Sequence, residues 1–127
     1  MLEGGGRDRG QATVELALSL PALAVLLGFV VEISLVSADQ VRLWHAAREA
    51  ARIAVVDPDH ETILAAASRS GLQGIELHIS PEPDYRVQGR PVTVSLAYNP
   101  SGRVPLIGEL SSRIELRARA SMRIEEP

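Results

Sequence analysis

The sequence predicts an α+β fold, in which a long N-terminal transmembrane helix packs on a small three-stranded antiparallel sheet. Three observations support this prediction. An uncharged, mostly apolar run of sixteen residues extends from Leu16 to Val31. An alanine-rich helical pattern then continues as far as Val56, where Asp57 and Pro58 end it, because the residue before a proline avoids the helical conformation. Three stretches of alternating apolar and polar residues follow, which is typical of strands with one buried face.

The first element is a helix of nearly membrane-spanning length. We expect its transmembrane part at about 16–37, and one continuous helix over 11–56 would be about 69 Å long. Arg7 and Arg9 precede the apolar run, and Asp39 follows it. Because positively charged flanks tend to remain on the cytoplasmic side, the sequence predicts a single pass through a membrane with the N-terminus in the cytoplasm and the C-terminal part outside.

The second half of the helix is amphipathic. One arc should face solvent and carries Arg42, His45, Glu49 and Arg52. The opposite arc should be buried and carries Leu43, Ala47, Ala50, Ala51 and Ala54. Because alanine forms helices well and has a small side chain, a sheet can lie close against this arc. Trp44, the only tryptophan, suits either a membrane-interface anchor or a core position, and we favour the core.

The remainder, residues 57–127, is predicted to form a small α+β extracytoplasmic domain. The segment 57–60 reads as a turn that caps a short helix at 61–70, and Gly71 closes that helix. The alternating patterns predict three strands, at 75–79, 92–98 and 114–124. Three strands with one apolar face need a cover, and the alanine-rich half of the long helix can supply it.

Glu15 is unexpected at the start of an apolar run, because a carboxylate in lipid costs roughly 2.5–3.5 kcal/mol at the centre of a helix and less near its end. Cleavage between Gly10 and Gln11 would create a positively charged amine one helical turn from Glu15, on the same chain or on a neighbouring subunit. A negative side chain also suits the first turn of a helix. The residues therefore suggest a leader peptide over 1–10, cleavage at Gly10 and Gln11, and pairing of Glu15 with the new N-terminus during assembly.

These residues resemble a known family. Arg-x-Arg-Gly followed by QATVE and an apolar helix looks like the class III signal of type IV pilins and pseudopilins. The longer stretch RGQATVELALSLPALAVLLG, followed by WHAAREAARIAVV, resembles TadE-like proteins of the tight-adherence (Tad/Flp) pilus system. The C-terminal stretches PVTVSLAYNP and LIGELSSRIELRARASMRIEE are also similar to the end of those proteins. The chain departs from many classical pilins in carrying Gln11 where they carry Phe.

The resemblance implies a type IV pilin-like fold and the role of a TadE-like minor pilin or pseudopilin. Such a protein would be made as a precursor in the inner (cytoplasmic) membrane and processed by a membrane prepilin peptidase. It would act in Tad/Flp-type pilus assembly, at that membrane or at the pilus and cell surface, and so in adherence or secretion. The implied partners are that peptidase, other pilin and Tad assembly subunits, and the membrane.

Two other interpretations of the N-terminus are open. A secretory signal peptide could be cut after Ala38, although its apolar region is usually 7–15 residues long, shorter than the run found here. The helix could also remain as an uncleaved anchor. Either would suit a membrane-anchored or secreted extracytoplasmic binding module outside any pilus.

Other positions have candidate roles in flexibility or contact. Pro21 removes one helical hydrogen bond, and Gly28 lies in the same run, so both could make the helix flexible; the alternative for Pro21 is an ordinary membrane-helix proline. Gly28 could also allow another helix to approach. Arg117, Arg119 and Arg123 form a basic stripe on the last strand, which is either a solvated face or a surface for a partner subunit.

Composition and spacing favour a protein without catalytic activity. The net charge of −3 gives no electrostatic reason to bind nucleic acid, and the chain has no cysteine. Its three histidines, His45, His60 and His78, fall on three different predicted elements, without the spacing of metal ligands. We therefore expect no enzyme activity, catalytic residue, metal, cofactor or small-molecule substrate.

Overall fold

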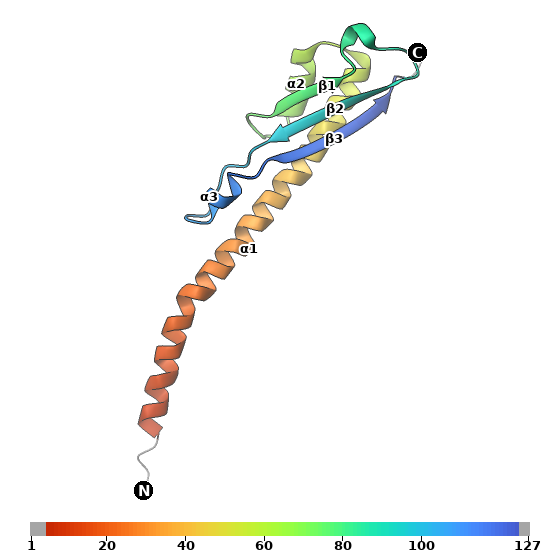
Figure 1. Cartoon of the computed structure of the whole chain (residues 1–127). Coiled ribbons are helices and arrows are strands. Elements are labelled where there is room, and N and C mark those ends of the chain that lie inside the picture. The colour runs from red at the N-terminus through yellow and green to blue at the C-terminus, as the bar shows by residue number, and fades with distance from the viewer. Residues whose placement is uncertain (1–4, 125–127) are drawn as a thin grey trace.

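The computed structural model describes residues 5–124, so residues 1–4 of the expected leader lie outside it. The elements in chain order are α1 (Gly5–Val56), α2 (His60–Ser68), β1 (Glu76–Ser80), η1 (Pro83–Tyr85), β2 (Pro91–Tyr98), α3 (Gly108–Ser111) and β3 (Leu116–Arg123). A small body covers only the distal part of the long helix α1 (Figure 1). The predicted α+β layout, a long apolar helix on a three-stranded antiparallel sheet, is confirmed.

Helix α1 has 52 residues and is therefore about 78 Å long. It continues without a break through Pro21 and ends at Val56, as predicted. Its N-terminal half is apolar and almost entirely outside the body, and leucines such as Leu16 and Leu18 are exposed. By length and composition this helix can cross a membrane once.

The sheet has the strand order β1-β2-β3, and both pairs are antiparallel. Leu96 lies opposite Leu77 on one side and Ala118 on the other, so the apolar positions of the three strands share one face. Val92 and Val94 continue that face along β2 and are fully buried. All three strand predictions are confirmed, with bounds shifted by one or two residues.

The core forms where the sheet and α2 meet α1. The predicted arc is buried, since Leu43, Ala47, Ala50, Ala51 and Ala54 are at most 2% exposed, and Ala46 joins them. The core prediction for Trp44 is wrong, because its side chain is 55% exposed. Trp44 lies one turn before the exposed Arg48 on the same ridge of the helix, beside the ridge that faces the sheet.

Helix α2 follows the predicted turn directly in the sequence. Asp59 is the N-cap, and its carboxylate accepts hydrogen bonds from the Thr62 backbone nitrogen at 3.1 Å and the Thr62 hydroxyl at 2.8 Å. Both hydrogen bonds lower the pKa of the Asp59 carboxyl, and the bond from the Thr62 hydroxyl has the larger effect. The helix covers His60–Ser68, slightly earlier than the predicted 61–70, and Gly71 follows with φ of 83°, a conformation that suits glycine.

Candidate assembly site on the long helix

The predicted cleavage residues lie on an unbroken part of α1. Gly10, Gln11 and Glu15 are all helical and exposed. A Cβ added at Gly10 would meet no atom within 4 Å, so the backbone is open to approach there. The rise from Gln11 to Glu15 is about 6 Å, one helical turn. Among the ion pairs of residues 8–124, none involves Glu15, so its carboxylate can face a partner.

Gly28 has a neighbour that the sequence did not indicate. A Cβ at Gly28 would lie 2.7 Å from Ile107 Cδ1 and 3.4 Å from Val104 Cγ1. The missing side chain therefore makes room for apolar residues from the segment between β2 and β3. Helix flexibility at Pro21 and Gly28 remains a prediction, and packing against Ile107 is a second reason for the glycine.

The segment 99–115, here called the strap, connects β2 to β3 and contains α3. In Figure 1 it extends beyond the sheet and lies beside α1 on the side of the N-terminus. Two glycines close it into a loop, since a Cβ on Gly102 would lie only 1.9 Å from the Gly108 carbonyl oxygen. Such close backbone contact excludes any larger residue, so the sequence positions of these glycines determine the strap's shape.

Glu32 lies beneath the strap and is only 4% exposed. Its Oε2 accepts hydrogen bonds from the backbone nitrogens of Val104, at 3.0 Å, and Arg103, at 3.3 Å. The Ser111 hydroxyl also contacts Glu32 Oε1, and lies 2.8 Å from the Gly108 carbonyl oxygen. A hydroxyl has one proton, and the charged carboxylate is the stronger acceptor. Three donors from the strap thus replace the water that this carboxylate loses on burial.

Asp39 is the second buried acid, at 1% exposure. Its Oδ2 lies 2.7 Å from Arg103 Nη2, and its Oδ1 lies 3.4 Å from Arg42 Nη1. The hydrogen bond to Asp39 raises the pKa of Arg103. Arg103 therefore uses its backbone at Glu32 and its side chain at Asp39, about 10 Å further along the helix.

Sequence analysis did not identify this pair of anchors. In the sequence, Glu32 directly follows the apolar run that ends at Val31, and Asp39 serves only as the charged residue that follows the run. Their spacing was a usable signal, because residues seven apart lie on the same face of a helix. Two acids on one face of a mostly apolar helix indicate a polar partner, although the spacing does not identify the strap as that partner.

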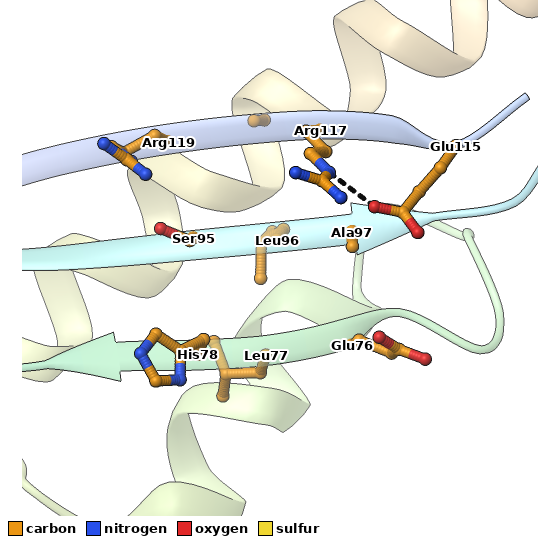
Figure 2. A pocket seen from close by; sticks show the side chains of 10 residues that line it. Glu76, Leu77, His78, Ser95, Leu96, Ala97, Glu115, Arg117 and Arg119 are labelled. Carbon is orange, nitrogen blue, oxygen red and sulfur yellow. Dashed lines mark hydrogen bonds and ion pairs between the residues drawn. The ribbon is translucent and has the colours of Figure 1, made fainter.

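The arginine stripe lies on the outer face of the sheet. Arg117, Arg119 and Arg123 are all exposed, and Arg117 pairs with Glu115. Figure 2 shows Arg117 and Arg119 on β3 at an open hollow, across which His78 lies on β1.

Arg123 does not join that hollow. It lies opposite Pro91 in the β2–β3 register, at the other end of the sheet, and lines a separate depression with Val56. The structure thus brings together two of the three arginines. A partner surface at this stripe remains a prediction.

The comparisons with known proteins bear on the long helix. A family model described as TadE-like protein matches residues 10–52. That segment starts at Gly10 and contains Glu15, both buried acids and most of the alanine arc, so the resemblance seen in the sequence is confirmed there. No curated protein and no solved structure matches the chain.

Proposed function

We propose that this chain, TadE-like over residues 10–52, is a minor pilin or pseudopilin of a Tad/Flp-type pilus system. One observation carries the proposal: the apolar half of α1 is left uncovered by the body, and a glycine followed five residues later by an acid stands at its start. An exposed apolar helix of this length needs lipid around it, or other helices. A pilin uses both in turn, the membrane before assembly and neighbouring subunits after it.

The proposed processing event is cleavage between Gly10 and Gln11 by a prepilin peptidase. Gly10 suits such a site because a residue without Cβ allows a protease close access to the backbone. The new amine at Gln11 would lie one turn from Glu15, or would reach Glu15 of a neighbouring subunit. Because that cation exists only after cleavage, assembly would depend on maturation. The protein is then a substrate in this chemistry and has no catalytic role itself.

The proposed location is a single pass through the cytoplasmic membrane. Arg7 and Arg9 would keep the N-terminus in the cytoplasm, and the body that carries the sheet would lie outside. Pilin and Tad assembly subunits would then meet the protein through α1, and a further contact could use Arg117 and Arg119 on the outer face of the sheet.

The intact mass of the mature protein, purified from cells with and without the peptidase, tests this function. We expect a chain that begins at Gln11 when the peptidase is present and a chain that retains residues 1–10 when it is absent. A mature chain that begins after Ala38 would instead indicate secretion. Retention of the leader in both strains would indicate a plain anchor, and either result would contradict the proposal.

Glu15→Ala should leave cleavage unchanged but greatly reduce co-assembly with other pilin subunits, because the new N-terminus loses its counter-charge. Glu15→Gln, which keeps the shape and removes the charge, should behave like the alanine variant, whereas Glu15→Asp should retain part of the co-assembly. Mass spectrometry measures cleavage, and crosslinking to captured subunits measures assembly. Since Glu15 is exposed, folding of the body should be the same in all three variants. Normal assembly of Glu15→Ala would remove the pairing argument.

A further inference from the structure

The tip of the strap presents an apolar side chain that nothing in the described chain covers. Leu106 is 94% exposed. The Ile107 backbone nitrogen donates to the Pro105 carbonyl oxygen at 2.8 Å, which makes a very tight turn with Leu106 at its apex. Leu106 has φ of 67° in this turn.

Leucine is an unfavourable choice at such a position. Positive φ is normally left to glycine or asparagine, because a Cβ adds strain there. The side chain gains no burial against the described residues in return, since it is almost fully exposed. A strained, exposed leucine therefore suggests contact with something outside the chain.

The position of the tip along α1 indicates what surrounds Leu106. Ile107, the next residue, lies against Gly28. Gly28 belongs to the apolar run and lies about 6 Å below Glu32 along the helix, in the direction of the N-terminus. Leu106 is thus level with helix residues whose own apolar side chains are exposed, among them Leu26, Leu27 and Phe29. The exposed apolar surface of the tip continues that of the membrane-spanning run.

The polar groups of the strap are arranged as a membrane boundary requires. Arg103 directs its guanidinium away from the tip to Asp39, as arginines do when their backbone lies near lipid. The backbone nitrogens of Arg103 and Val104 bind Glu32 and are not left bare. The exposed pair Glu109 and Arg113, whose charged atoms lie 3.6 Å apart, follows the tip on the part of the strap that leads back to β3.

We propose that the tip, residues 104–107, inserts shallowly into the outer leaflet of the membrane that α1 crosses, with Leu106 among the lipid chains. Lipid is the partner because the tip is continuous with the apolar run and lies about 6 Å below Glu32, the first charged residue after that run, which is within the depth of an interfacial anchor, about 5–10 Å. The inference rests on the proposed membrane anchoring of α1. The strap would thereby fix the rotation and height of the body above the bilayer.

Site-directed labelling of the full chain in lipid vesicles tests this inference, and the absence of native cysteines makes each label unique. A nitroxide at Leu106→Cys is compared with one at Val87→Cys, an exposed apolar position that lies in the body between η1 and β2, and with one at Leu18→Cys on the apolar run. Electron paramagnetic resonance then measures relaxation by oxygen, which concentrates in lipid, and by a water-soluble nickel complex. Thermal unfolding shows that each labelled variant is folded.

We expect the ratio of oxygen to nickel relaxation to be several-fold higher at Leu106 than at Val87, and to approach the ratio at Leu18. A ratio at Leu106 equal to that at Val87, with Leu18 still in lipid, would overturn this inference and leave the anchoring of α1 intact. Shielding of Leu106 from both reagents, with spin coupling between copies, would assign the tip to a second copy of the chain and would also overturn it. Water around Leu18 would refute the membrane anchoring and this inference with it.

Discussion

Gly102→Ala is expected to release the strap from α1 and to lower the free energy of unfolding by about 3 kcal/mol or more. The new methyl group would lie 1.9 Å from the Gly108 carbonyl oxygen, an overlap with backbone that no change of rotamer can relieve. The loop between the two glycines must therefore open. Opening it removes the backbone donors of Arg103 and Val104 from Glu32. It also removes the Arg103 guanidinium from Asp39, which then keeps only its longer pair with Arg42.

Two measurements on the full chain in detergent check this result. Thermal unfolding gives the loss of stability, and Ser101→Ala, an exposed neighbour in the same loop, should be close to wild type. Hydrogen exchange gives the local effect, because the amides of Arg103 and Val104 should lose protection while those of β2 keep it. Protection at both amides equal to that of the wild type would contradict the proposed dependence on Gly102.

The elements that the sequence predicted correctly are those with a local signal. Alternation specified the three strands because one face of each packs on the core, and the alanine arc specified which side of α1 meets the sheet. Asp57 and Pro58 marked the end of α1 through the chemistry of the proline itself. The core prediction for Trp44 was wrong because the angular position of Trp44 on the helix, one turn before Arg48, places it outside the buried arc.

The strap could not be predicted because its contacts join distant parts of the chain. Ser111 is 79 residues from Glu32, and Arg103 is 64 residues from Asp39. No pattern within the sequence of the strap states which helix residues it will cover. Two features of the sequence reflect this contact, the spacing of the two acids and the pair of glycines. However, the acids are also compatible with a solvated helix face, and the glycines with an ordinary loop.

Three acids lie near the two ends of the apolar run of α1, and they differ in whether the chain itself supplies their partners. The difference supports the proposal that the N-terminal part of α1 meets other subunits. Glu32 and Asp39 are satisfied by the same chain, so these two carboxylates need no partner from another molecule. Glu15 has no such compensation among residues 8–124 and lies where the body cannot reach. Of these three acids, Glu15 is therefore the one whose charge remains for another molecule, and it lies beside the predicted cleavage site.

Asp39→Ala is expected to lower the free energy of unfolding by about 1.5–3 kcal/mol, because it leaves Arg103 without its charged partner. Arg42→Ala should cost no more than about 1 kcal/mol, since Arg42 is more than half exposed and its pair with Asp39 is longer. The contrast separates the two arginines: Arg103 belongs to the strap, whereas Arg42 belongs to α1 itself. Denaturant unfolding of the full chain in detergent measures both changes.

A double-mutant cycle shows where the energy of Asp39 resides. If Arg103 is its main partner, Asp39→Ala combined with Arg103→Ala should destabilise the chain by clearly less than the sum of the two single changes, because the second change removes a charge that the first left unpaired. The same cycle with Arg42→Ala should be nearly additive. Additivity in the Arg103 cycle would mean that the 2.7 Å ion pair contributes little, and that the contacts of Glu32 and the packing at Gly28 hold the strap against the helix.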